Sequence, residues 1–168
     1  MAKNSPRTVP YRRVREQKTN YKKRLALLLS GKPRLVVRTT NSRVIGQLIS
    51  FHVQGDTVIA AADSFSLRKL GWSGSTMNTP AAYLTGLLLG KKGLAHGCKE
   101  AIVDTGFRSP AKKGKIYAFV KGVLDAGIII PHDPGIFPEQ DRLQGKHLKS
   151  AISAQFTSVE QKIMHLKQ

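Results

Sequence analysis

The chain has 168 residues, enough for one ordinary domain, and its 28 lysines and arginines against 10 acids give a net charge of +18, so a polyanion is the expected partner. One cysteine, Cys98, excludes an intramolecular disulfide and a cysteine-clustered zinc site. The start MAKNSPR has no apolar core of a signal peptide, and the apolar runs stop short of the roughly 20 residues that span a bilayer, so we expect a cytosolic protein with no membrane partner.

The N-terminal quarter carries most of the charge. Residues 1–43 contain 13 of the 28 basic residues and a single acid. Residues 1–19 hold two prolines and little that could pack, so we expect an arm that is disordered until a partner orders it. Asn20 then caps a short helix, with Tyr21 and the leucines that follow it on one face. We therefore interpret residues 1–33 as a basic arm and short helix.

Residues 34–131 are predicted to form an α/β core that begins with three strands. The runs Leu35–Thr40, Val44–Val53 and Thr57–Ala62 are rich in aliphatic and β-branched residues, and polar turns separate them. The third run is almost entirely apolar, which favours a strand covered on both sides. We therefore expect helices on both faces of the sheet, followed by a loop over residues 63–77.

Helices and strands alternate in the second half of this core. Thr79-Pro80, a capping hydroxyl followed by proline, marks a helix start, and Gly90 and Gly93 with Lys91 and Lys92 are expected to mark the end of that helix. Glu100–Asp104 reads as a buried strand, residues 116–124 as an amphipathic helix, and Ile128–Ile130 as a fifth strand. This order implies parallel pairing with right-handed crossovers.

Residues 132–168 are predicted to be a tail. The sequence PHDPGIFPEQ has no helical or strand period. A modest helix within residues 147–166 is the regular structure expected there.

The basic arm with its interleaved tyrosines is the main functional signal. Guanidinium groups bind phosphates in bidentate fashion, and aromatic rings stack on unpaired bases. A solvated tail that serves solubility is the plain alternative, but charge for solubility need not be so one-sided. The predicted nucleic-acid contacts of this arm are Arg7, Tyr11, Arg12, Arg13, Arg15, Lys18, Tyr21, Lys22, Lys23 and Arg24.

Two further groups of cations lie beyond the arm. Arg34, Arg38 and Arg43 flank the first hairpin, where its ends are expected to meet solvent. A second group, Arg108, Lys112 and Lys113, precedes a predicted helix start, where free backbone N–H groups attract anions. Taken alone, this second group is read equally well as an ordinary exposed loop.

Enzymatic patterns are weaker. The segment GLLLGKK lacks the glycine spacing, the hydroxyl and the position of a phosphate-binding loop, and the histidines show no metal-ligand spacing. Asp63 and Asp104 end predicted strands, where a two-metal nuclease would hold carboxylates, but the first strand contains no acid. We therefore expect no catalytic site, metal or cofactor, and we expect both aspartates to cap backbone groups or pair with cations.

Five blocks follow one another along nearly the whole chain: RLVVRTTNSRVIGQLISF, GDTVIAAADS, NTPAAYLTGLLLGKK, DTG ahead of GKIYAFVKGVLDAG, and IPHDPGIFPEQDRLQGKHL. With the arginine-rich start they resemble the large-subunit ribosomal protein L-eighteen family, in its archaeal and eukaryotic branch. The resemblance implies a ribonuclease H-like mixed sheet of five strands without the catalytic acids. It also implies a structural protein of the cytoplasmic ribosome that binds 5S rRNA and anchors it to large-subunit rRNA in the central protuberance, beside the L-five ribosomal protein.

The resemblance also suggests which residues contact RNA. Carried over by position, they are Arg7, Tyr11, Arg12, Arg13, Arg15, Lys22 to Arg24, Arg34, Arg38, Asn41 and Arg43, with contributions from Phe107 and Arg108. The chain has FRSPAKK where the bacterial branch has a glycine-rich loop, and it lacks the longer C-terminal extension of eukaryotic members, which favours an archaeal source. Two alternatives stay open: an RNA-binding protein that acts off the ribosome, and a metal-dependent nuclease on the same fold.

Overall fold

The chain alternates strands with helices around one mixed sheet. The computed structural model describes residues 9–148 and 150–166. In chain order the elements are α1 (Arg12–Arg15), α2 (Tyr21–Leu28), β1 (Arg34–Thr39), β2 (Val44–Ser50), β3 (Thr57–Asp63), the 3-10 helix η1 (Ser64–Leu70), α3 (Thr79–Ala95), β4 (Ile102–Asp104), α4 (Lys115–Asp125), the 3-10 helix η2 (Pro134–Ile136), α5 (Gln140–Leu143) and α6 (Ser150–Met164). Within the described ranges, no helix is both long and apolar enough to cross a bilayer.

The sheet has the strand order β3-β2-β1-β4, with four strands among the described residues. β1 pairs antiparallel with β2, and β2 with β3, whereas β4 runs parallel to β1. The run predicted as a fifth strand contributes one parallel bridge, between Glu100 and Ile129. Pro131 follows almost at once and has no N–H to donate, which limits further pairing. The mixed α/β prediction is confirmed, and the structure has a bridge where the fifth strand was expected.

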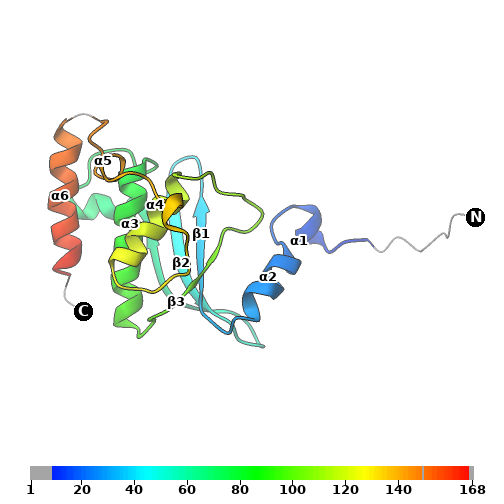
Figure 1. Cartoon of the computed structure of the whole chain (residues 1–168). Coiled ribbons are helices and arrows are strands. Elements are labelled where there is room, and N and C mark those ends of the chain that lie inside the picture. Colours follow the sequence, from blue (N-terminus) through cyan, green and yellow to red (C-terminus); the bar gives the residue numbers. More distant parts are fainter. Residues whose placement is uncertain (1–8, 149, 167–168) are drawn as a thin grey trace, which may run out of the picture.

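Helices α3, α4 and α6 lie on one side of the sheet (Figure 1). Asn78 caps α3 by accepting a hydrogen bond from the backbone N–H of Ala81 at 2.9 Å, and Pro80 occupies the first turn. The core lies between this helical layer and alternate residues of the strands, such as Leu35 and Leu48, which face each other across β1 and β2.

Glycines let α3 and α4 approach closely. A Cβ atom on Gly86 would collide with the carbonyl oxygen of Phe119, and one on Gly122 would collide with the carbonyl oxygen of Tyr83. Gly90 packs against Ala126 in the same seam. The expectation that α3 ends near Gly90 is therefore wrong: this glycine makes room for a neighbouring helix, and α3 continues to Ala95.

The opposite face of the sheet is only partly covered. α1 and α2 lie on this side, beside β1 (Figure 1). In β3, Ala60 and Ala62 are buried whereas Ala61 between them is exposed. The prediction of helices on both faces is thus wrong for the β3 side of the sheet. An alanine exposes little apolar surface, so the apolar run of β3 does not require a second helical layer.

The C-terminal helix and the segment predicted as a loop both contribute to the core. α6 buries Phe156, Val159 and Ile163, and it packs against α3. The predicted loop over residues 63–77 contains η1 and a buried Trp72, whose Nε1–H donates to the carbonyl oxygen of Ser75 at 3.1 Å. The predicted terminal helix is confirmed as α6.

Candidate nucleic-acid interface

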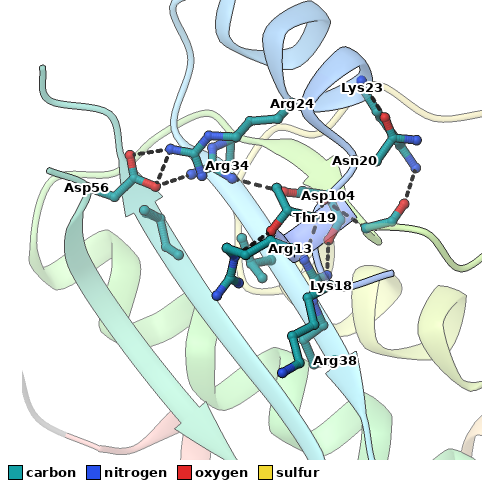
Figure 2. Close-up of a pocket in the computed structure, with 13 residues that line it drawn as sticks. Arg13, Lys18, Thr19, Asn20, Lys23, Arg24, Arg34, Arg38, Asp56 and Asp104 are labelled. Carbon is teal, nitrogen blue, oxygen red and sulfur yellow. Dashed lines mark hydrogen bonds and ion pairs between the residues drawn. The ribbon is translucent and has the colours of Figure 1, made fainter. Parts of the chain in front are cut away.

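A chain of ion pairs joins α2, the turn before β3, β1 and the end of β4 (Figure 2). Arg24 of α2 donates to both carboxylate oxygens of Asp56, at 2.9 and 2.8 Å. Arg34 donates to Asp56 at 2.6 Å and to Asp104 at 2.9 Å. Arg38 donates to the backbone oxygen of Asp104 at 2.8 Å. These charge-assisted bonds fix α2 to the sheet.

The strand register explains this arrangement. Alternation along β1 sends Leu35 and Val37 into the core, and it leaves Arg34 and Arg38 on the side of α2. Parallel pairing sets Asp104 beside Val36, between the two arginines. The acid therefore meets both guanidinium groups.

Residues of the arm and of α2 enclose a cavity of about 190 Å³ above this chain of ion pairs. The side chain of Asn20 accepts the backbone N–H of Lys23 at 3.0 Å and so caps α2 as predicted. The Nζ of Lys23 donates to Thr105 Oγ1 at 3.0 Å and to the Gly106 carbonyl at 3.3 Å. The cavity is lined by six cations, Arg13, Lys18, Lys23, Arg24, Arg34 and Arg38, and by two carboxylates, Asp56 and Asp104.

The arm has more local structure than expected. Arg7 lies outside the described residues, but Arg12–Arg15 form the turn α1, where we expected no structure before a partner binds. Arg13 Nε donates to Thr19 Oγ1 at 2.9 Å, and the rings of Tyr11 and Tyr21 meet edge to face at 5.7 Å between centroids. These local contacts offset part of the entropy cost of ordering the segment. The exposed members of the predicted set here are Tyr11, Arg12, Arg13, Arg15, Lys18, Tyr21 and Lys22.

The predicted hairpin residues divide into two groups. Asn41 and Arg43 are exposed at the turn, and Arg43 pairs with Asp63 at 2.9 Å. Arg34 is only 3% exposed, so the expectation that it meets solvent is wrong. Asp56 and Arg24 of α2 cover this end of β1.

The loop after β4 brings further predicted residues to the sheet. Arg108 donates to Thr39 Oγ1 at the end of β1, and Phe107 is 43% exposed beside it in the chain. Lys113 instead pairs with Glu139 at 3.1 Å, and Lys112 lines a shallow pocket with the same glutamate. Phe107 and Arg108 thus extend the candidate surface, while the two lysines face the segment before α5.

The two aspartates singled out from the sequence have structural partners. Asp104 binds the arginines of β1 and accepts the N–H of Gly106 at 2.8 Å, and Asp63 accepts the N–H of Phe65 at 2.9 Å as the cap of η1. The predicted pairing and capping roles are confirmed. In the part of the chain that the structure describes, no cluster of three or more His, Cys, Asp or Glu side chains has a geometry suited to a metal ion.

Sequence reasoning missed Asp56, which holds two arginines. The sequence indicates only that this residue lies in a turn between two strands. An acid in a turn between strands, with an arginine on a nearby strand, is the pattern that could have indicated Asp56. Its pairing with Arg34 depends on how the turn packs against β1, which the sequence does not show.

Comparisons with known proteins identify the family of the chain. The family described as ribosomal large subunit proteins 60S L5 and 50S L18 matches residues 7–100, which include most of the arm, α1, α2, three strands and α3. The large ribosomal subunit protein uL18 of the archaeon Thermofilum pendens (strain DSM 2475 / Hrk 5) is 50% identical over 148 residues, which are 88% of this chain and 76% of that protein. The chain therefore belongs to the family of ribosomal large subunit proteins 60S L5 and 50S L18.

Proposed function

We propose that the protein is a structural constituent of the large ribosomal subunit in the cytoplasm and that it binds ribosomal RNA through α1, α2 and the β1–β2 hairpin. Membership of the family supports the ribosomal role. We choose this surface as the RNA-binding surface because its cavity is lined by six cations and only two carboxylates. Such an excess of positive charge in a recess attracts a polyanion strongly.

The RNA that we propose as the main partner is 5S rRNA, with large-subunit rRNA as a second partner and the L-five ribosomal protein as a neighbour in the central protuberance. The sequence resemblance supports this choice. Phosphate contacts supply most of the affinity, and stacking and shape supply specificity. The contact residues that we propose are the exposed ones and the half-buried Arg38: Tyr11, Arg12, Arg13, Arg15, Lys18, Tyr21, Lys22, Arg38, Asn41, Arg43, Phe107 and Arg108.

We also infer that the sheet is ribonuclease H-like and that the chain is not an enzyme. The strand order β3-β2-β1-β4, with the bridge at Ile129 beyond β4, supports the first inference. The second rests on Asp63 and Asp104, whose carboxylates are engaged by arginines. Incubation of 5S rRNA with the protein and magnesium or manganese should leave the RNA intact. Cleavage that Asp104→Asn abolishes would establish the nuclease instead.

Competitive binding tests the proposed function. The protein should prefer 5S rRNA over transfer RNA at physiological salt, and deletion of residues 1–19 should weaken 5S rRNA binding by orders of magnitude and flatten its salt dependence. Equal affinity for an unrelated RNA of the same length would overturn the assignment and favour a general RNA-binding protein.

A matched pair of variants separates local contact from total charge. Arg15→Gln with Lys22→Gln removes two exposed cations of the candidate surface. Lys69→Gln with Lys99→Gln removes two exposed cations from η1 and from the segment before β4. The first pair should weaken 5S rRNA binding clearly more than the second. Equal losses would place the RNA elsewhere on the protein.

A further inference from the structure

The cavity between the arm and β1 is a recess with unbalanced charge. Its lining residues come from three segments: Arg13 and Lys18 from the arm, Lys23 from α2, and Arg38 from β1 (Figure 2). The cavity volume is about 190 Å³. One water molecule needs only roughly 10–15 Å³ of cavity volume on the same measure, so the cavity has room for a phosphate group. A small anion could therefore touch the arm and the sheet at once.

The partners of the lining cations show where charge is left over. Four of the six lie beside carboxylates: Arg24 and Arg34 bind Asp56, Lys18 pairs with Glu16 at 2.9 Å, and the Nη2 of Arg38 lies 3.6 Å from Asp104. Within the described residues, Arg13 and Lys23 bond to neutral oxygens, those of Thr19 for the first and of Thr105 and Gly106 for the second, and to no carboxylate. The cavity also contains Asp56 and Asp104, but a guanidinium and an ammonium that line it and bond to no carboxylate favour the binding of an anion.

Arg34 adds a second, independent observation. Its side chain is 4% exposed and lines the cavity, and its Nε–H is a buried donor with no partner among the described residues. Buried donors are nearly always satisfied in folded proteins, so an unused one calls for an acceptor that the chain itself does not provide. A tetrahedral oxyanion offers several acceptor oxygens to donors that converge from different directions.

We propose that this cavity binds one phosphate group, that of a single backbone phosphodiester of the bound RNA. The inference rests on the proposed function and goes further by naming the group and its seat. The phosphate is held between Arg13 on the arm, Lys23 on α2 and the buried Nε–H of Arg34 on the sheet, and Lys18 and Arg38 add positive charge to the lining. Because these cations come from separate segments, the bound phosphate closes the arm onto β1 and fixes the angle at which α1 leaves the core.

Two double variants of the full chain test the site. Arg13→Gln with Lys18→Gln removes two lining cations. Arg12→Gln with Arg15→Gln removes two cations from the same short segment that do not line the cavity. The pairs match in charge, and each includes one partner of Glu16. All four residues are exposed, so both variants should keep the native amide spectrum of the core.

The first measurement uses inorganic phosphate as the probe. In the wild type and in Arg12→Gln with Arg15→Gln, the Gly106 amide resonance should shift and saturate with phosphate, but not with chloride at equal ionic strength. In Arg13→Gln with Lys18→Gln the dissociation constant should rise about tenfold, the effect of losing one strong charge-assisted contact. No saturable shift in the wild type, or the same dissociation constant in both variants, would overturn the proposal.

The second measurement asks whether the phosphate belongs to RNA. With 5S rRNA whose phosphates are ethylated at random, one position should interfere with binding of the wild type and of Arg12→Gln with Arg15→Gln, but no longer with that of Arg13→Gln with Lys18→Gln. Retention of every interfering position in Arg13→Gln with Lys18→Gln, or loss of the same position in both double variants, would remove the RNA phosphate from this cavity. Failure of the site alone would leave the preference for 5S rRNA intact, whereas failure of the proposed function would abolish that preference.

Discussion

Replacement of Arg34 by methionine is the sharpest test of what holds α2 and the sheet together. The side chain of Arg34 is 4% exposed and bridges two carboxylates that belong to different elements. Methionine keeps much of the volume and removes the charge. Asp104, with a side chain only 9% exposed, is then left in a buried place with less compensation.

The expected loss follows from the partners that remain. Breaking a buried ion pair by removing one member costs about 3–5 kcal/mol, because the other charge is left uncompensated. Asp56 keeps Arg24, and Asp104 keeps the Gly106 N–H and Arg38, whose Nη2 lies 3.6 Å from its carboxylate. We therefore expect the lower end, about 3 kcal/mol of unfolding free energy. For a chain of this size that lowers Tm by roughly 6–12 °C.

Urea unfolding followed by circular dichroism measures this loss directly. Arg43→Met is the control, since its pair with Asp63 has the same 2.9 Å separation but lies at the surface, and it should cost about 0–1 kcal/mol. Adding Asp104→Asn to Arg34→Met should recover part of the loss, because the orphaned charge is gone. A loss below about 1 kcal/mol for Arg34→Met, equal to that of the control, would refute the reasoning.

Three further predictions concern packing and titration. Gly122→Ala should destabilise the fold by about 3 kcal/mol in urea unfolding, since its Cβ would collide with the backbone of α3, whereas Gly135→Ala should change stability by less than about 0.5 kcal/mol; equal effects would refute the seam. Burial raises the pKa of Glu160 above 4.5, and the charge of Asp125 adds to the rise, so the folded state holds this proton more tightly and stability falls as pH rises above 4.5. Glu160→Gln should therefore gain stability over the wild type between pH 4.5 and 7, and a pH-independent difference would contradict this. Burial also raises the pKa of the Cys98 thiol, so a maleimide should react slowly with the native protein and quickly in urea; rapid native labelling would show that this thiol is exposed.

Helix caps and short turns could be predicted from the sequence because they depend on residues that are close together in the chain. Asn20 was predicted to cap α2, and its side chain accepts the expected backbone N–H. The helix start predicted at Thr79-Pro80 is also present, although Asn78 and not Thr79 provides the cap. The first hairpin was also predicted, because β-branched runs around a short polar turn specify strands through local geometry. A cap or a turn involves residues only a few positions apart, so its signal survives in the sequence.

The sequence by itself determined the class of the protein and its cationic arm. Only the tertiary structure decided that Arg34 is buried and Arg43 exposed, because the partners of Arg34 are 22 and 70 residues away and reach it through the sheet and a folded turn. It also decided that Gly90 packs against Ala126 instead of ending a helix. Periodicity predicts which way a side chain points, but what covers it depends on contacts between distant segments.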